Sequence, residues 1–470
     1  MAAPTIGLLV YGFALRVDRP RPSRRQSARC HDGRAMQLTA GGVPMKPRLL
    51  LGSGLIGALD QALLSAFNLA LGVAFIKLAV KADYADYALV ATALLLLQSL
   101  QNALVNSPLA TLLPAATDDA RRAEVQRAGE MVQGWLQLAV VLLGALVLAT
   151  LLLTDRAPAL PLAGATLLAG LGTLSREFTR AQCFLRHDAP AALRSDLLYV
   201  LVASLGLSAL LWQGGIAAAP VLAVVGAAGL LASLLMQGGG AAALWRRLHR
   251  PAPVHWVGLR ALWGCARWAL PSVVNSWLYG NAYLFLVERM LSKDAVADLS
   301  ASRLLLVPMS LLVVGWASAF RPLASRWLAN EQVRQVNRVA LRSALVFVVV
   351  GIAYGALLHG LMPLLQAGLL GEKYRSAGQL APLWLLFFMS TAVRTVGMSA
   401  MLASSKAFRT LFHYGWAALA VAVPGVWLAC IGGNLAGVLL ALLAAELVLL
   451  ALVWWRGWPA IRRDALQGGA

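Results

Sequence analysis

About a dozen apolar stretches, each close to 20 residues long, follow one another between Leu49 and Trp455, with short polar loops between them. The hydrocarbon core of a bilayer is about 30 Å thick, and a helix needs about 20 apolar residues to cross it. The stretches are rich in Leu and Ala and lack the alternation of barrel strands. The pattern therefore predicts an all-α integral membrane protein with about 12 transmembrane helices.

The predicted spans and regions follow from the positions of these stretches. The spans run over Leu51–Leu78, Tyr87–Leu112, Met131–Leu153, Ala159–Leu174, Leu197–Trp212, Ile216–Gln237, Trp268–Met290, Leu299–Ala319, Ala344–Leu365, Leu380–Ala403, Leu411–Cys430 and Leu435–Trp455. The predicted regions are a basic tail (1–48), an N-terminal six-helix lobe (49–240), a basic connector (241–267), a C-terminal six-helix lobe (268–456) and a second tail (457–470).

The charge distribution predicts how the chain is oriented. Only 13% of the residues are charged, yet the net charge is +20. Most arginines lie in every second loop, and the positive-inside rule places those loops and both termini in the cytoplasm. There they would contact anionic membrane lipids. None of the usual basic modules for nucleic acid is present, so we expect no nucleic-acid partner. The prevalence of Arg, Ala, Leu and Gly suggests a bacterial protein of the inner membrane.

The first 48 residues differ from the rest. The short apolar run Thr5–Leu15 precedes a series of arginines, which is the reverse of the order in a signal peptide. We expect either a disordered cytoplasmic tail or a true translation start at Met36 or Met45.

A weak internal repeat predicts two related halves. Lys293 and Asp298 follow Lys81 and Asp86 by 212 positions, and both pairs have the spacing Lys-x4-Asp. Arg394 follows Arg176 by 218 positions. Because the copies lie six spans apart they run in the same direction, which predicts two six-helix bundles related by a parallel pseudo-two-fold axis.

Ionisable residues within predicted spans mark candidate functional positions, because a charge in the bilayer core is costly. Asp60, Arg303, Arg394 and Glu446 are such residues. Two roles remain open for them: a functional group, or one half of a structural ion pair. We predict Asp60 and Glu446 as ion-coupling groups or counter-ions, since a buried carboxylate can take up a proton.

Polar side chains at helical spacing predict a hydrated cavity between the halves. Gln98, Asn102 and Asn106 share one face of the second span. Similar stripes occur in the first span and in the seventh; they contain Gln61, Ser65, Asn68, Ser272, Asn275, Ser276, Tyr279 and Tyr283. Hydrogen bonding between helices is the alternative reason for each stripe.

No cofactor or metal is expected. The four cysteines are scattered singly, and no phosphate-binding loop or catalytic constellation occurs in the sequence. We therefore predict that the protein is not an enzyme and that transport would depend on a gradient or a partner.

The segments Asp60–Asn68, Lys81–Leu89, Gln101–Pro108 and Arg176–Arg180 resemble the polysaccharide-transport branch of the multidrug/oligosaccharidyl-lipid/polysaccharide (MOP) exporter superfamily. These are the flippases for O-antigen and exopolysaccharide repeat units. Ala85 stands in a turn where that branch usually has glycine.

The resemblance implies two lobes, alternating access and a lipid-diphosphate-linked oligosaccharide as substrate, used in surface polysaccharide biosynthesis. A polysaccharide polymerase and other assembly proteins would be further partners. An unpaired charge is rejected by hydrocarbon, and arginine pairs well with phosphate oxygens. We therefore assign Arg303 and Arg394 to the diphosphate. The groups assigned to sugar hydroxyls are Asn68, Asn102, Asn106, Asn275 and Tyr279.

Three alternatives remain from the sequence. The first is a cation-coupled drug or metabolite antiporter of the same superfamily, which would favour buried carboxylates. The second is a membrane-embedded glycan-processing enzyme, although the loops are short for one. The third is a subunit that works only with a partner.

Overall fold

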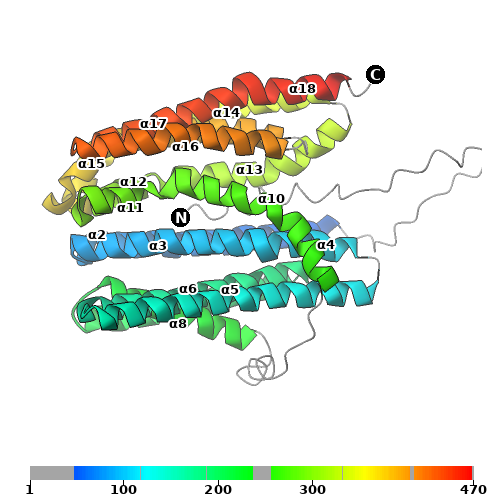
Figure 1. The fold of residues 1–470 in the computed structure, drawn as a ribbon. Helices are drawn as coiled ribbons and strands as arrows, with labels where there is room; N and C mark the ends of the chain where they lie inside the picture. Colours follow the sequence, from blue (N-terminus) through cyan, green and yellow to red (C-terminus); the bar gives the residue numbers. More distant parts are fainter. Residues whose placement is uncertain are drawn as a thin grey trace, which may run out of the picture.

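The computed structural model describes residues 47–116, 118–186, 188–236, 256–330, 332–402 and 407–467, and within these ranges the chain is almost entirely helical. Nearly all of the long helices run roughly parallel or antiparallel to one another (Figure 1). Helix α2 begins, and helix α18 ends, at the same end of the bundle (Figure 1). This end is the predicted cytoplasmic end, and we call the other one the outer end. The predicted start sites Met36 and Met45 lie outside the described residues.

The N-terminal lobe contains the helices before the connector. They are α2 (Pro47–Leu78), α3 (Lys81–Gln101), the π-helical segment η2 (Asn102–Asn106), α4 (Ser107–Ala115), α5 (Asp119–Leu153), η3 (Ala157–Ala159), α6 (Leu160–Leu185), α7 (Ala189–Trp212) and α8 (Ala218–Met236).

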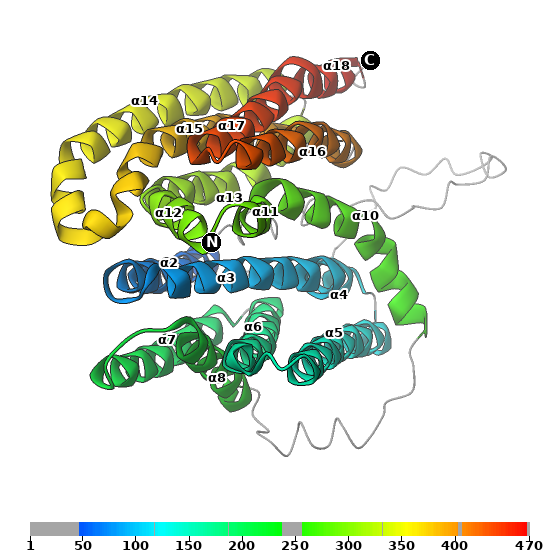
Figure 2. The ribbon, with the colours of Figure 1, turned by 60° about the vertical axis from the view of Figure 1, so that its left-hand side comes forward.

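The C-terminal lobe contains the remaining helices. They are α10 (Trp256–Asn281), α11 (Tyr283–Met290), α12 (Lys293–Leu304), α13 (Val307–Ala329), α14 (Val333–Leu365), η4 (Gln366–Leu370), η5 (Glu372–Tyr374), α15 (Arg375–Met401), α16 (Ala407–Ile431), α17 (Leu435–Ala451), η6 (Leu452–Gly457) and α18 (Trp458–Gln467). Figure 2 shows α2 and α3 between this lobe and the rest of the N-terminal lobe.

Among the described residues, eleven helices are long and apolar enough to cross a membrane, and the protein is a multi-pass membrane protein. The seventh predicted span, Trp268–Met290, is not among these eleven and is interrupted. Helix α10 ends at Asn281 and α11 begins at Tyr283. The 26-residue α10, which contains Pro271, and the 8-residue α11 thus replace one continuous apolar helix at this position.

The connector and the second tail are partly helical. Residues 237–255 lie outside the described residues, but from Trp256 onward the predicted connector is the first part of α10. Gly258 at the start of α10 donates its backbone N–H to Glu124 of α5, 3.1 Å away. Helix α10 therefore begins against the N-terminal lobe and leads into the other one.

Helix α6 packs tightly against α8 because glycines face each other. A Cβ atom added at Gly226 would lie 2.6 Å from the backbone nitrogen of Ala169, closer than real Cβ atoms come. Small residues allow membrane helices to approach in this way. This contact fixes the position of α6, which carries charged residues toward the space between the lobes.

The fourth and fifth helices are longer than the sequence predicted. Helix α6 continues eleven residues beyond the predicted end at Leu174, and α7 begins eight residues before Leu197. The loop that was predicted between them is thus largely helical. Arg176, Arg180 and Asp196 lie within these helices, where they can reach other helices.

Candidate functional site

A cavity of about 410 Å³ lies between the two lobes. Its wall contains residues from α2, α3, η2, α6, α7 and α8 on one side and from α11, α12 and α13 on the other. Along α3 and η2 the lining runs from Tyr84 to Asn106, which is roughly 33 Å at about 1.5 Å per residue. The wall therefore covers a distance close to the thickness of a bilayer core.

The polar stripes of the first two spans line this cavity. Gln98, Asn102 and Asn106 are on its wall, together with Gln61, Ser65 and Asn68 of α2. Residues 102–106 form a π-helix, a feature that is often found at functional sites. The Oδ1 atom of Asn106 and the Oγ atom of Ser300 have no hydrogen-bond partner among the described residues. Both residues are on the cavity wall, and these two atoms are themselves buried.

A charged cluster in the N-terminal lobe borders the cavity, and Arg180 is at its centre. The Nη2 atom of Arg180 lies 2.6 Å from Oδ2 of Asp60. Its Nε atom lies 2.9 Å from Oδ2 of Asp196. Both aspartates have an exposed fraction of 0%, whereas Arg180 reaches the cavity wall. One guanidinium thus holds two fully buried carboxylates from α2 and α7.

Arg176, one turn before Arg180, completes the cluster. Its Nη2 atom lies 2.6 Å from Oε1 of Glu177, and Nη1 lies 3.6 Å from Oδ1 of Asp196. Its guanidinium also covers the ring of Tyr199 at 4.3 Å from the centroid. The cluster contains three carboxylates and two guanidinium groups, so it has one carboxylate in excess.

Arg303 on α12 faces the cavity from the opposite lobe. It forms no ion pair with any residue that the structure describes. Its guanidinium lies 5.7 Å from the centroid of the Trp384 ring, within the range of a cation–π contact. The structure therefore places a cation with no carboxylate partner on the wall of a polar cavity.

The other predicted binding residues lie elsewhere. Arg394 donates to Glu446, and the Tyr279 hydroxyl donates to the same carboxylate. Glu446 has an exposed fraction of 0%, and Asn275 is also buried. Neither these four residues nor Asp60 line the cavity. Arg394 and Glu446 form a buried ion pair within the C-terminal lobe, and their charges are directed at each other.

Arg176, Arg180, Glu177 and Asp196 were missed as site residues, because the sequence interpretation placed them in a cytoplasmic loop. The internal repeat contained a signal that could have found them. Arg176 and Arg394 occupy matching positions, and Arg394 was assigned to a span. The repeat thus implies that Arg176 also lies inside a helix, as α6 shows.

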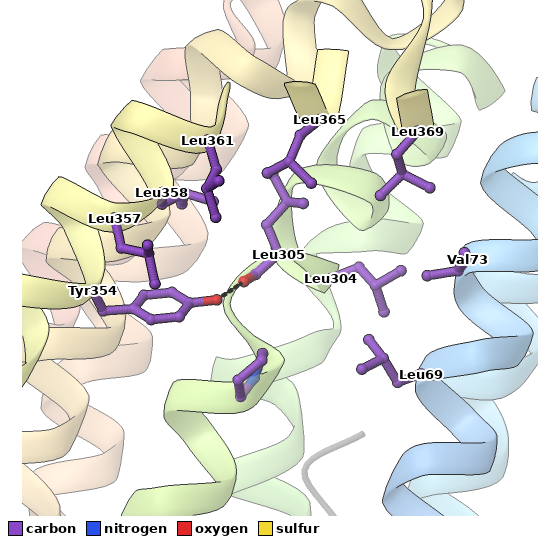
Figure 3. A pocket seen from close by; sticks show the side chains of 11 residues that line it. Leu69, Val73, Leu304, Leu305, Tyr354, Leu357, Leu358, Leu361, Leu365 and Leu369 are labelled. Carbon is purple, nitrogen blue, oxygen red and sulfur yellow. Dashed lines mark hydrogen bonds between the residues drawn. The ribbon is translucent and has the colours of Figure 1, made fainter. Parts of the chain in front are cut away.

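A second, apolar hollow of about 210 Å³ lies beside the cavity, among α2, α12, α13, α14 and η4. Figure 3 shows its walls, which are built mainly from leucine side chains. The chain breaks its helical pattern at Leu305, and the hydroxyl of Tyr354 donates to the carbonyl of Leu305 at 2.5 Å (Figure 3). This bond satisfies a carbonyl that has left the helical pattern at the junction of α12 and α13.

Leu304 separates the two hollows and belongs to the walls of both. Its side chain points toward α2, where Leu69 and Val73 lie (Figure 3). A Cβ atom added at Gly72 would lie 2.9 Å from Cδ1 of Leu304. The absence of a side chain at Gly72 therefore lets α2 and α12 approach closely beside Leu304.

Chemically, the arrangement suits an anion with an apolar attachment. The cavity offers guanidinium and amide groups, and the adjoining hollow offers aliphatic surface. Among the described residues, no group of three or more His, Cys, Asp or Glu side chains is placed to hold a metal ion.

Solved structures with a similar fold are membrane transporters. The chain superposes on the inward-facing conformation of a multidrug resistance MATE family transporter of the MOP superfamily, with a TM-score of 0.62 and 13% identity over 86% of this chain and 96% of that one. The chain has the fold of the MOP-superfamily transporters. This fold consists of two six-helix bundles, as predicted.

Two further structures agree. The lipid II flippase MurJ in an inward closed conformation has a TM-score of 0.61 and 12% identity, over 89% of this chain and 91% of that one. An outward-facing conformation of a MATE family transporter has a TM-score of 0.57 and 13% identity, over 89% of this chain and 96% of that one. No protein-family model and no curated protein matches the sequence. The fold is shared with drug transporters and with a flippase, and these comparisons establish the fold alone.

Proposed function

We propose that this protein moves a lipid-diphosphate-linked oligosaccharide across the bacterial cytoplasmic membrane by alternating access. The observation that carries the proposal is Arg303, a cation on the cavity wall with no ion-pair partner among the described residues. Arginine presents a planar set of donors that match phosphate oxygens. A diphosphate would find here the counter-charge that hydrocarbon lacks.

Arg176 and Arg180 would supply further contacts to the diphosphate, since both reach the cavity wall. Their carboxylate partners keep them in place when no substrate is bound. Asn68, Asn102 and Asn106 would hydrogen-bond to the sugar hydroxyls, since all three residues line the cavity. Arg394, Asn275 and Tyr279 have no place in this binding site, because they lie away from the cavity.

The apolar hollow supports a lipid-linked substrate. A soluble drug would require only the central cavity, whereas a lipid-linked glycan has a headgroup and a chain that need different surroundings. Here both environments adjoin at Leu304. We propose that the headgroup occupies the cavity while the isoprenoid chain leaves past Leu304 toward the membrane.

A cation-coupled antiporter is the second candidate, and one observation favours it. Asp60 and Asp196 are completely buried and share Arg180, which makes them suited to taking up a proton. The same pair can serve the flippase, where proton uptake would free Arg180 for the substrate. We therefore assign Asp60 and Asp196 to coupling in either case.

Purified protein in liposomes tests the proposal directly. Fluorescent lipid-diphosphate-linked oligosaccharide should be flipped by the parent protein, and Arg303→Ala should reduce the rate by at least tenfold, which corresponds to about 1.4 kcal/mol. Arg303→Lys should retain part of the activity, because it keeps the charge but loses the planar donor geometry. Each variant must insert and purify like the parent.

Two results would decide against the flippase. One is equal flipping by Arg303→Ala and the parent. The other is proton-driven export of a cationic dye by liposomes that do not flip the glycolipid at all. In the native host, removal of the protein should abolish surface polysaccharide and leave repeat units on the inner leaflet. An unchanged surface glycan with altered dye resistance would favour the antiporter.

A further inference from the structure

The repeated motif Lys-x4-Asp brings the two lobes together at the outer end. Lys81 of α3 lies 2.8 Å from Oδ1 of Asp298 on α12. Lys293 of α12 lies 2.6 Å from Oδ1 of Asp86 on α3. Each lysine thus pairs with the aspartate of the other copy. Figure 2 shows α12 beside α3 where this contact occurs.

The contact has the form of a two-fold interface, in which a residue i meets j and j meets i. Ala85 and Ala297, four residues after each lysine, are also equivalent in the repeat, and both have an exposed fraction of 0%. Small residues at these positions let α3 and α12 approach closely. The same six-residue motif is therefore used twice, once from each lobe.

The helix dipole does not explain why lysines occupy these two positions. Lys81 and Lys293 are the first residues of α3 and α12, where the helix dipole favours anions over cations. Asp83 and Asp294, in the same first turns, suit that dipole. The lysines gain their stabilisation from the aspartates of the opposite lobe.

A third segment covers this contact. Lys373 in η5 donates to the backbone carbonyl of Ala79, at the end of α2. The buried Tyr374 meets Tyr84 edge to face, with 6.2 Å between the ring centroids. Because Tyr84 also lines the central cavity, the aromatic pair lies next to the outer end of that cavity, and the ion pairs are close by on α3 and α12.

We propose that the pairs Lys81–Asp298 and Lys293–Asp86 form a latch, here called the outer latch, that holds the outer end closed and releases as one unit. Both pairs connect α3 to α12, so a movement that separates these helices breaks both together. Partial exposure makes the latch reversible. The side chains of Lys293 and Asp86 are 45% and 20% exposed, so water can hydrate them when they separate.

Pulsed electron paramagnetic resonance on the full chain tests the latch. Spin labels at Val80→Cys and Arg375→Cys, both exposed at the outer end, would report the distance between the lobes in a background without Cys30, Cys183, Cys265 and Cys430. Lys81→Met with Lys293→Met keeps the aliphatic stems and removes both charges. We expect the ratio of long to short distances to rise roughly 3- to 30-fold, from the loss of two partly exposed ion pairs.

Lys77→Met is the matched control, because it removes a lysine at the same end that forms no ion pair among the described residues. It should leave the distances unchanged. Lys81→Asp should open the outer end through repulsion from Asp298, and adding Asp298→Lys should restore the parent distribution by recreating the pair in reverse.

Variants are compared only if they purify as a single species with the melting temperature of the parent. If Lys81→Asp does not fold, the double variant Lys81→Met with Lys293→Met tests the latch alone. The latch is disproved if the Met double variant matches the Lys77→Met control, or if the exchanged pair stays open while Lys81→Asp is folded. The measurement reports conformation and not transport. The result of this test therefore does not depend on the identity of the substrate.

Discussion

The two lobes have arginines at equivalent positions of the repeat, but the surroundings of these arginines differ. Arg176 in α6 lies on the cavity wall within a cluster that has one carboxylate in excess. Arg394, its counterpart in the repeat, lies in α15 and shares Glu446 with Tyr279, away from the cavity. Arg176 has two carboxylate partners, whereas Arg394 has one among the described residues.

The comparison shows that a repeated position can lie on a cavity wall in one lobe and inside the packed helices of the other. What differs is the number of carboxylates within reach. In the N-terminal lobe Asp60, Glu177 and Asp196 surround two arginines, and in the C-terminal lobe one glutamate meets one arginine. We therefore expect substitutions in the C-terminal pair to affect stability and substitutions in the N-terminal cluster to affect transport.

The largest effect should follow Glu446→Ala. It leaves the buried Arg394 without a carboxylate, and breaking a buried pair in this way costs about 3–5 kcal/mol. Asp196→Ala should cost less, because Arg176 keeps Glu177 and Arg180 keeps Asp60. Unfolding in mixed micelles with increasing SDS would measure both free energies. Equal losses in the two variants would contradict the difference between the lobes.

Replacing whole ion pairs with apolar residues should separate stability from transport. Arg394→Met with Glu446→Leu should keep transport within about threefold of the parent, because an apolar pair of similar volume can replace a buried ion pair. Arg180→Met with Asp60→Leu should insert normally yet lose at least about tenfold in rate. Flipping in liposomes measures both. Loss of transport in the C-terminal double variant would show that Arg394 has more than a structural role.

The smallest effect should come from two tyrosine hydroxyls. Tyr279→Phe removes a donor to the buried Glu446 and should cost about 1.5–3 kcal/mol of stability, the usual value of a hydrogen bond to a charged group. Tyr199→Phe keeps the ring face that contacts Arg176 and should cost less than about 0.5 kcal/mol. The same SDS titration compares them. A larger loss of stability in Tyr199→Phe than in Tyr279→Phe would contradict the difference expected between the two hydroxyl groups.

Much of the fold could be predicted because membrane insertion selects long apolar stretches. The apolar stretches predicted an all-helical protein with about 12 transmembrane helices, and the internal repeat predicted two six-helix bundles. The prediction was wrong at the ends of α6 and α7, since hydropathy counts Arg176 and Asp196 as loop residues. Each of these charges is balanced by a partner on another helix. Composition along one segment contains no information about such partners.

The site was predicted less completely for a related reason. Periodicity shows which residues share a face but not what that face meets. The stripe Gln98, Asn102, Asn106 lines the cavity, whereas Asn275 and Tyr279 form a similar stripe that packs inside the C-terminal lobe. The two Lys-x4-Asp motifs were visible in the sequence, but their reciprocal pairing required the packing of α3 on α12.

Helix α12 is only 12 residues long, about 18 Å, yet it carries Lys293, Asp298, Arg303 and Leu304. One short helix thus carries the residues of the outer latch, the cation assigned to the headgroup and the leucine beside the apolar hollow. A helix this short moves as a unit, so a tilt at one end also shifts the other end. A headgroup that moves Arg303 would therefore also move Lys293 and Asp298, because all three residues are on the same helix.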